Sequence, residues 1–330
     1  MAIPEWQFYW SNWIAIPKHI FENYGEPCVC VANKQWADFW LYSFSNYVKK
    51  YGIKGVFHDM ALPYAEEGLL NGLGYEKNGI RYPEYPIWEL RDIFKKTYII
   101  HRKIFPDAMS FMNYGVFLPP IHSFCDFLLC GERYETRADR SIYDLDGDGN
   151  ISRFTWQSSL PFGPKAMLND WLKYQYAMEE KEPTVHLYGT VLLHDLVQWN
   201  INENPEVRKG IHLLKKRFGI GYNKEVEFLP YWDHEDKYDV DSGDVVISFY
   251  RYGQRLMAVL VNTRMKKTFQ GKVELNLKKL GIENVEKIEI YDPLNNTYNS
   301  LKKEGGEGKL VISTEILPTL FKTVLINCDP

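Results

Sequence analysis

Four places in the chain put polar, potentially reactive side chains directly after a short apolar run. They are His58-Asp59 after residues 55–57, Asn113-Tyr114 after 110–112, Gly131 to Tyr134 after 127–130, and His194-Asp195 after 190–193. In a parallel β/α fold the functional groups collect at the carboxyl ends of strands, so these residues are the first candidates for chemistry. A carboxylate in such a place is costly unless it is solvated, paired or used. Asp59 could instead be a loop or helix-cap residue, and Glu132 could form an ion pair with Arg133 or Arg137.

Two carboxyl groups on neighbouring strand ends are the minimum requirement for cleaving a glycosidic bond. One protonates the leaving oxygen, and the other acts as nucleophile, base or charge stabiliser. Asp59 and Glu132 meet this requirement, but their separation cannot be read from the sequence, so retaining and inverting routes both stay open. The side chains predicted to contact a sugar are His58, Tyr64, Arg81, Asn113, Tyr114, Tyr134 and Trp156. Neighbours in a strand point to opposite faces, so His58 and Asp59 line one site only if the strand ends at Phe57.

A separate acidic motif in the long loop after Glu132 predicts a metal site. The residues Asp144, Asp146, Asp148 and Asn150 occupy positions 1, 3, 5 and 7 of a run that matches the D-x-D-x-D-G pattern of a calcium loop. Thr155 stands at position 12, where such loops usually have a bidentate glutamate, and this lowers the expected affinity. We expect a structural Ca²⁺ that fixes the long loop after Glu132. The alternative is an acidic turn without metal, because Asp and Gly are also common turn residues.

The elements that must position these residues alternate between helix and strand. The apolar spacing and the Pro and Gly positions predict helices at 36–51, 86–105, 165–180 and 204–219, strands at 53–59, 108–113, 124–130 and 184–191, and loops at 60–85 and 131–163. This rhythm is typical of parallel β/α units. We therefore predict an α/β fold, a (β/α) barrel, over residues 1–222.

The pattern changes after Tyr222. Short strands separated by turns are predicted at 245–252, 255–262, 273–277, 287–291, 310–313 and 321–326. They predict an antiparallel β-sandwich as a second domain over residues 223–330. Nine of the ten tryptophans precede residue 223, which also favours a two-domain chain.

The number of predicted parallel strands is too small for a closed barrel. About four or five β/α units are found before residue 222, whereas a barrel needs eight. Either strands near residues 5–10 and 28–31 escape recognition, or the barrel is incomplete at its amino terminus because the chain is the carboxyl-terminal part of a longer protein.

Composition and charge exclude several other classes of protein. The 330 residues carry 39 basic and 43 acidic side chains without a basic stripe, so no nucleic-acid partner is expected. No apolar run reaches the roughly 20 residues that cross a bilayer, so no membrane partner is expected. The five cysteines lie at no zinc-ligand spacing, and we expect most of them to be buried thiols. The first residues lack the features of a signal peptide.

Several of these segments together resemble a known family of enzymes. The run from Tyr51 to Met60, the loop residues 72–75 and 81–83, Asn113, the segment 124–134 and the boundary residues 228–232 are similar to the catalytic barrels related to glycoside hydrolase family 123 and their bacterial relatives. The resemblance implies a carbohydrate substrate, a barrel followed by a β-domain, and catalytic positions at Asp59 and Glu132. Such barrels normally have earlier strands upstream, and a truncated member would be secreted or periplasmic.

One departure from the family limits what the resemblance implies. Characterised members use an adjacent Asp-Glu pair, whereas Asp59 is followed by Met60 and Glu132 is preceded by Gly131. N-acetylgalactosamine specificity and help from the substrate's N-acetyl group are therefore not carried over. Two functions stay open: a glycoside hydrolase, and a non-catalytic carbohydrate-binding or scaffold protein that retains the barrel.

Overall fold

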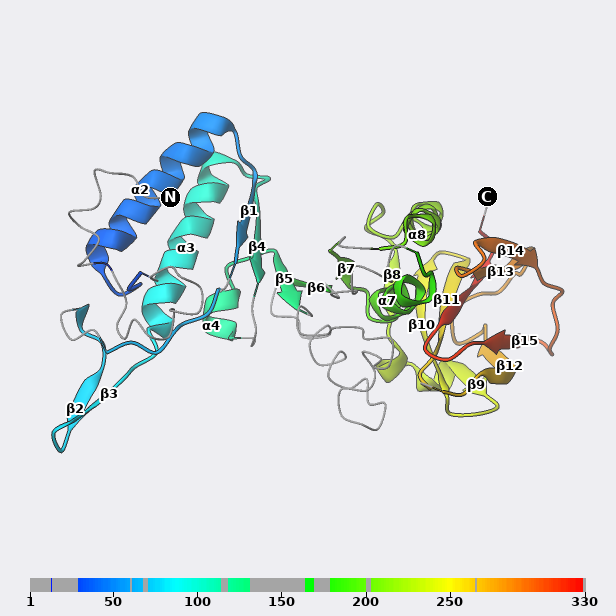
Figure 1. Cartoon of the computed structure of the whole chain (residues 1–330). Helices are drawn as coiled ribbons and strands as arrows, with labels where there is room; N and C mark the ends of the chain where they lie inside the picture. Colours follow the sequence, from blue (N-terminus) through cyan, green and yellow to red (C-terminus); the bar gives the residue numbers. More distant parts are fainter. Residues whose placement is uncertain are drawn as a thin grey trace. The chain divides into compact units, whose positions relative to one another are not determined.

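The computed structural model describes Trp13 and residues 29–59, 61–67, 71–113, 118–130, 164–168, 179–199, 203–264 and 266–328. Their contacts divide into two compact units. The first contains the described residues up to Leu129 together with residues 164 and 165, and the second contains residue 130 and the described residues from Ala166 onward. Figure 1 shows the elements of both units, coloured along the sequence.

The first unit combines three parallel strands with two long helices. Its elements are α2 (Lys34–Tyr51), β1 (Gly55–His58), β2 (Tyr75–Lys77), β3 (Ile80–Tyr82), α3 (Ile87–Ile104), β4 (Met109–Asn113), α4 (Pro119–His122) and β5 (Phe127–Cys130). Strand β4 lies between β1 and β5, and both pairings are parallel. The register sets Phe57 beside Phe111 and Phe111 beside Phe127. These three rings therefore share one face of the sheet.

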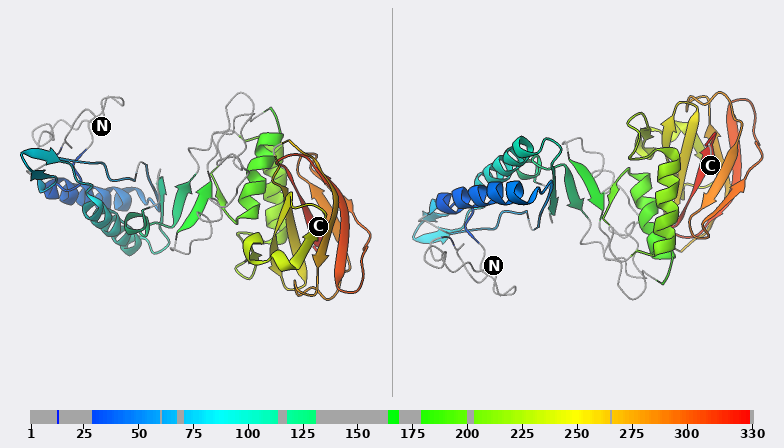
Figure 2. Two further views of the ribbon diagram at one scale, coloured as in Figure 1. Left: turned by 90° about the horizontal axis from the view of Figure 1, so that it is seen from below. Right: turned by 90° about the horizontal axis from the view of Figure 1, so that it is seen from above.

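The two long helices form where the sequence predicts them. The side chain of Asn33 accepts a hydrogen bond from the backbone N–H of Trp36 and so caps α2, and Gly52 ends this helix with a φ of 63°. Helix α3 begins one residue later than predicted, because Pro86 is its N-cap and not its first helical residue. The two helices lie side by side (Figure 2). The ring of His101 on α3 reaches the backbone oxygen of Ile53, 2.9 Å away, and ties the helix to the start of β1.

The second unit begins with a short parallel pair and two further helices. They are β6 (Lys165–Leu168), β7 (Val197–Gln198), α7 (Glu182–Leu193) and α8 (Pro205–Phe218). The first residue of β6, Lys165, is assigned to the first unit. Helix α8 is confirmed with its predicted caps. The side chain of Asn204 accepts from the backbone N–H groups of Glu206 and Val207, and Gly219 ends the helix with a φ of 98°.

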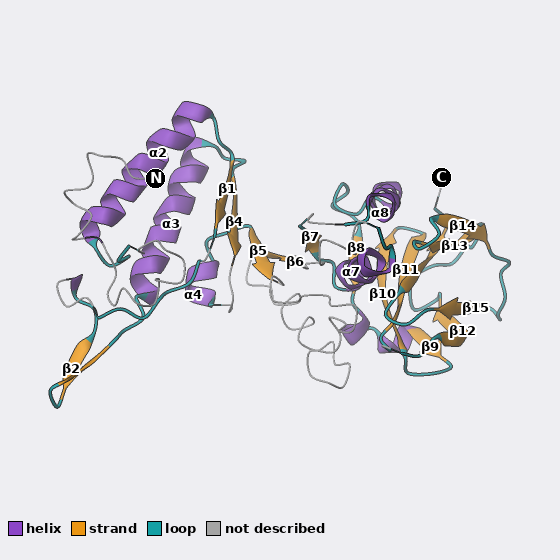
Figure 3. Ribbon diagram, viewed as in Figure 1, coloured by secondary structure: helices purple, strands orange, loops and turns teal. Residues whose placement is uncertain are grey.

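An antiparallel β-sandwich forms the rest of this unit (Figure 3). Its strands are β8 (Glu227–Leu229), β9 (Tyr238–Val240), β10 (Val245–Tyr252), β11 (Arg255–Asn262), β12 (Phe269–Asn276), β13 (Ile288–Asp292), β14 (Thr297–Ser300), β15 (Lys309–Ile316) and β16 (Phe321–Ile326), with the short 3₁₀ turns η5 (Tyr231–Asp233) and η6 (Glu235–Lys237) after β8. One sheet has the order β14-β13-β16-β11-β10-β8, and the other has the order β15-β12-β9.

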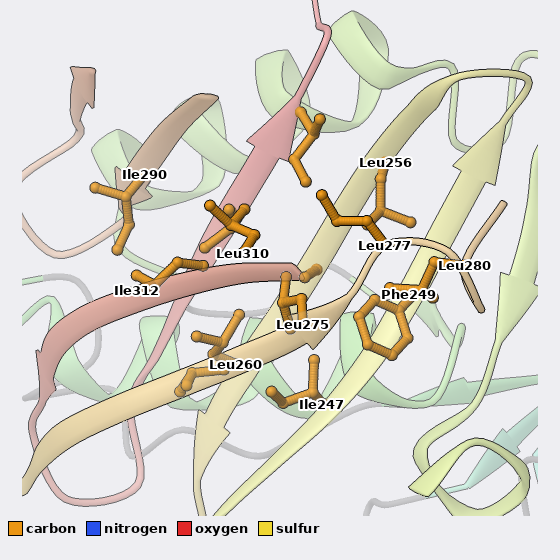
Figure 4. Close-up of a cluster of buried hydrophobic side chains, with 14 of the residues drawn as sticks. Ile247, Phe249, Leu256, Leu260, Leu275, Leu277, Leu280, Ile290, Leu310 and Ile312 are labelled. Carbon is orange, nitrogen blue, oxygen red and sulfur yellow. The ribbon is translucent and has the colours of Figure 1, made fainter. Parts of the chain in front are cut away.

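The core of the sandwich lies between its two sheets. Ile247, Phe249 and Leu260 of the larger sheet pack with Leu275 and Ile312 of the smaller one, and all five are buried (Figure 4). Inward apolar and outward polar residues alternate along β12 and β15, whereas β11 is buried at every position from Leu256 to Asn262 and reads as a nearly continuous apolar run. All six predicted sandwich strands are confirmed, whereas β8, β9 and β14 were not predicted.

Two predictions in the region between the long loop and α8 are wrong. Residues 184–191, predicted as a strand, belong to helix α7, and residues 165–168, predicted as the start of a helix, form strand β6. Every residue of α7 from Thr184 to Leu193 is buried, so this part of the helix has no exposed polar face and shows no helical period. The apolar run 166–168 is short, and such a run cannot be assigned by periodicity alone.

The predicted loop at 60–85 contains the hairpin of β2 and β3, and helix α4 lies before β5 in a stretch where no element was predicted. In Figure 1 the hairpin projects away from α2 and α3. Gly74 precedes strand β2 of the hairpin and has a φ of 79°. A Cβ atom at this position would lie 3.0 Å from the backbone oxygen of Tyr82. Gly79 in the turn of the hairpin has a φ of 74°.

Parallel β/α units followed by an antiparallel sandwich agree with the predicted fold class. Within the described residues, the parallel pairs β1–β4, β4–β5 and β6–β7 form no closed barrel. Contacts join α7 and α8 with the sandwich in one unit, so compactness alone does not separate the chain at residue 222, and the division into 1–222 and 223–330 stays a prediction. No helix in the described ranges is long and apolar enough to cross a membrane. Cys30, Cys125 and Cys328 are buried free thiols, as expected.

Candidate functional site

Asp59 and Asn113 meet at one edge of the parallel sheet. Strand β1 ends at His58 and β4 ends at Asn113, and the two strands are parallel neighbours, so their carboxyl ends lie together. The side-chain amide of Asn113 donates a hydrogen bond to Oδ1 of Asp59 over 2.8 Å. Asn113 is only 5% exposed, whereas Asp59 is exposed. The structure thus brings these two predicted strand ends together, and the pair presents an oriented carboxylate to solvent.

The turn that follows Asp59 is held by two further hydrogen bonds. The backbone N–H of Ala61 donates to the backbone oxygen of Asn113 over 2.9 Å. The backbone oxygen of Ala61 lies 3.1 Å from Nε2 of His122, a residue of helix α4. The other ring nitrogen of His122 accepts from the backbone N–H of Leu118 over 2.9 Å. Burial lowers the pKa of His122 to about 4, so the ring is neutral near pH 7.

The ring of His58 lies on the face of the sheet that the helices cover. Its centroid is 5.1 Å from that of Phe94 on α3, in an edge-to-face contact. Strand β1 continues through His58, and neighbouring side chains along a strand point to opposite faces of the sheet. The His58 ring and the Asp59 carboxylate therefore do not lie on the same face. Burial, with a smaller contribution from His101, lowers the pKa of His58 to about 4. Its predicted contact with a sugar stays a prediction.

Tyr64 and Arg81 lie in the segment between β1 and α3. Tyr64 is half-buried and packs against a small cluster around Cys30 and Leu73. Arg81 is exposed in β3, in register with Glu76 of β2. Their predicted roles as substrate contacts stay predictions.

The remaining predicted site residues lie outside the described part of the chain. They are Glu132, Tyr114, Tyr134 and Trp156 for the active site, and Asp144, Asp146, Asp148 and Asn150 for Ca²⁺. In the described ranges no group of three or more His, Cys, Asp or Glu side chains is arranged to hold a metal ion. The second carboxylate and the calcium loop therefore stay predictions.

Two of the buried carboxyl groups in the described part of the chain have a raised pKa, and neither was foreseen. In the first unit Glu66 accepts a hydrogen bond from the thiol of Cys30, and burial raises the pKa of both groups, to about 12 for the thiol. In the second unit Glu203, which follows β7, accepts from the hydroxyl of Tyr188 over 2.8 Å and from the side-chain amide of Gln198. Burial raises the pKa of Glu203 as well. Both residues stand in irregular segments, where no periodic pattern signals burial.

No known protein family and no curated protein matches the sequence of the chain. Its fold is similar to that of solved structures, among them the noncanonic maltogenic α-amylase AmyB from Thermotoga neapolitana, with a TM-score of 0.52 at 12% sequence identity, covering 91% of this chain and 67% of that chain. Amy13B from Eubacterium rectale has a TM-score of 0.51 at 9% identity, covering 92% of this chain and 65% of that chain. At such low identity the similarity shows the fold alone, and no match supports family 123 in particular. The structural neighbours of the chain are nevertheless glycoside hydrolases, and their fold is the α/β architecture with a β-domain that the sequence predicts.

Proposed function

We propose that the chain is a glycoside hydrolase and that Asp59 and Glu132 are its two catalytic carboxyl groups. The observation that carries the proposal is the exposed Asp59 carboxylate, which the Asn113 amide orients at the carboxyl edge of β1 and β4. Barrel enzymes place their chemistry at this edge. The similarity of the fold to that of glycoside hydrolases supports a carbohydrate substrate.

The contact with Asn113 indicates which role Asp59 takes. The amide donates to Oδ1 of Asp59, so this oxygen acts as an acceptor, and the group is suited to serve as nucleophile, general base or stabiliser of positive charge. Glu132 then supplies the general acid. Tyr64, Arg81, Tyr114, Tyr134 and Trp156 are the proposed sugar contacts, since aromatic rings stack on sugar faces. A Ca²⁺ ion held by Asp144, Asp146, Asp148 and Asn150 is the proposed stabiliser of the loop after Glu132.

Charge-removing substitutions test this proposal. Soluble starch and a panel of nitrophenyl glycosides serve as substrates. Asp59→Asn and Glu132→Gln should each lower kcat at least about 100-fold, because an acid, base or nucleophile contributes about that much or more. Asp107→Asn is the matched control. Asp107 is an exposed aspartate of the same unit that lies between α3 and β4 and forms an ion pair with Lys54 over 2.8 Å. Its loss should leave kcat within about twofold of the parent.

The same assay separates the two functions that the sequence leaves open. Turnover within a few-fold of the parent in both Asp59→Asn and Glu132→Gln would refute the catalytic assignment. A parent that binds oligosaccharides in calorimetry but releases no product from any substrate would instead indicate a carbohydrate-binding protein.

A further inference from the structure

We propose that His122 is a positioning residue for Asp59: its neutral ring holds the backbone turn that carries the catalytic carboxylate. This inference rests on the proposed function, since it gives Asp59 a catalytic role. It concerns a residue of helix α4 that is 61 positions away from Ala61 along the chain.

A chain of hydrogen bonds leads from the ring to the carboxylate. Nε2 of His122 holds the backbone oxygen of Ala61, the backbone N–H of Ala61 is held by the backbone oxygen of Asn113, and the side-chain amide of Asn113 holds Oδ1 of Asp59. Asn113 thus bonds to both Asp59 and Ala61, and His122 bonds to Ala61 as well. Three hydrogen bonds therefore hold Asp59 and Ala61, and the direction of the Asp59 side chain depends on all three.

The tautomer of the His122 ring follows from its two partners. The N–H of Leu118 donates to Nδ1, so Nδ1 carries no proton. Nε2 then carries the proton of the neutral ring and donates it to the oxygen of Ala61. The ring is completely buried and Ala61 is 1% exposed, so water cannot replace either bond without a rearrangement. An apolar side chain at position 122 would leave the Leu118 N–H and the Ala61 carbonyl without these partners.

The arrangement gives His122 a role that goes beyond filling space. Displacement of a reacting group by about 1 Å lowers turnover about 100-fold. Loss of the bond to the Ala61 oxygen frees the turn on one side, whereas loss of the bond to the Leu118 N–H loosens only the start of α4. The two bonds of one ring therefore have different expected effects on catalysis.

Two near-isosteric variants remove one bond each. His122→Gln places an amide N–H near the position of Nε2 and keeps the donor to Ala61, while it loses the acceptor for Leu118. His122→Asn places an amide oxygen near the position of Nδ1 and keeps the acceptor, while it loses the donor. We expect kcat to fall about 10- to 100-fold in His122→Asn with KM changed less than about threefold, and to stay within about threefold of the parent in His122→Gln. Both variants should have similar melting temperatures, because each loses one buried hydrogen bond.

Amide hydrogen exchange tests the same inference without any substrate. Exchange at the Ala61 N–H should become about tenfold faster in His122→Asn and stay near the parental rate in His122→Gln, because only the first variant frees the turn. Equal exchange rates in the two variants, or a kcat that falls equally in both, would overturn the positioning role.

Two further measurements keep the outcomes distinct. In the unaltered protein, the ¹⁵N shifts of the His122 ring should show a proton on Nε2 and none on Nδ1, and the opposite tautomer would overturn the inference even if neither variant folds. Asp59→Asn is measured alongside. If it is as active as the parent, or the parent is inactive, the proposed function fails and the exchange rates still decide whether His122 holds the turn. If Asp59→Asn is inactive and His122→Asn has parental kcat, only the positioning role fails.

Discussion

The buried Glu203 of the second unit offers a sharp test of the electrostatics of the fold. Glu203 is 5% exposed and accepts hydrogen bonds from Tyr188 on α7 and from Gln198 at the end of β7. These two bonds fasten the segment after β7 to both elements. The substitution Tyr188→Phe removes one hydroxyl donor and leaves the ring in place, so it changes the hydrogen bonding of Glu203 without opening a large cavity.

The expected loss follows from the charge of the acceptor. A hydrogen bond to a charged group in a buried site contributes about 1.5–3 kcal/mol, and one between neutral groups contributes about 0.5–1.5 kcal/mol. We therefore expect Tyr188→Phe to lower the free energy of unfolding by about 2 kcal/mol at a pH where Glu203 is ionised. The loss should shrink to about 1 kcal/mol or less when Glu203 is protonated.

The pH dependence has a definite sign. Burial raises the pKa of Glu203 above its ordinary value of 4.5, and the donors from Tyr188 and Gln198 oppose this rise. Without the Tyr188 donor the folded-state pKa lies higher still. As the pH rises from about 4.5 through the folded-state pKa, the unfolded chain binds fewer protons than the folded one and the free energy of unfolding falls. This fall extends to higher pH in the variant, so its deficit against the parent grows towards neutral pH.

Urea unfolding followed by circular dichroism measures the deficit at about pH 5 and about pH 7.5. The exposed Tyr222→Phe is the control, and it should change the free energy of unfolding by less than about 0.5 kcal/mol at both pH values. In a Glu203→Gln background, where the acceptor carries no charge, the pH dependence of the Tyr188→Phe deficit should disappear. A deficit that is the same at both pH values in the parental background would refute the reasoning.

Three further predictions concern other parts of the chain. Gly210→Ala in α8 should destabilise the protein by about 1–3 kcal/mol in urea unfolding, because the new methyl group would overlap the Tyr291 hydroxyl and lie 2.7 Å from Oδ1 of Asn296. Alanine is normally the better helix residue by about 1 kcal/mol, so a stabilised variant would contradict this packing. Millimolar Ca²⁺ should raise the melting temperature by a few degrees and Asp146→Ala should abolish the effect, whereas an unchanged melting curve would favour an acidic turn without metal. Burial lowers the pKa of His186 from 6.5 to about 3, so the stability that this neutral histidine contributes is present above pH 6.5 and is lost as the pH falls towards 3. The melting temperature of His186→Asn should therefore drop less between about pH 7 and about pH 5 than that of the parent. An equal drop would exclude His186 as a source of acid sensitivity.

The helices show which signals in the sequence were sufficient. Helices α2 and α8 have one apolar face, an asparagine cap at the start and a glycine at the end, and all of these signals are local. Helix α7 is buried on every face from Thr184 to Leu193, so its apolar residues and the buried polar Thr184, His186 and Thr190 follow no helical period. What distinguishes α7 from a buried strand is its packing against other elements, and a pattern within one segment cannot contain that information.

The candidate site shows the same division between local and tertiary information. The pairing of Asp59 with Asn113 was predictable, because both residues end parallel neighbouring strands and the topology brings such ends together. The strand β1 is one residue longer than a shared site for His58 and Asp59 requires, because it continues through His58 and does not end at Phe57. This one residue places His58 on the opposite face from Asp59. The burial of Glu203 depends on Tyr188 and Gln198, which reach it from a helix and a strand.

Burial increases stepwise from the proposed catalytic group to its supports. Asp59 is exposed, Asn113 behind it is nearly buried, and Ala61 and His122 are buried completely or almost so. A carboxylate that must reach substrate cannot be packed on all sides, so its orientation has to come from partners that are. Because the partners are shielded from water, each of their hydrogen bonds has no easy replacement, and a change at His122 is transmitted to Asp59 as a change of geometry. Substitutions at the buried end of this series of hydrogen bonds should therefore affect turnover more than substrate binding, and those at proposed sugar contacts such as the exposed Arg81 should affect binding more than turnover.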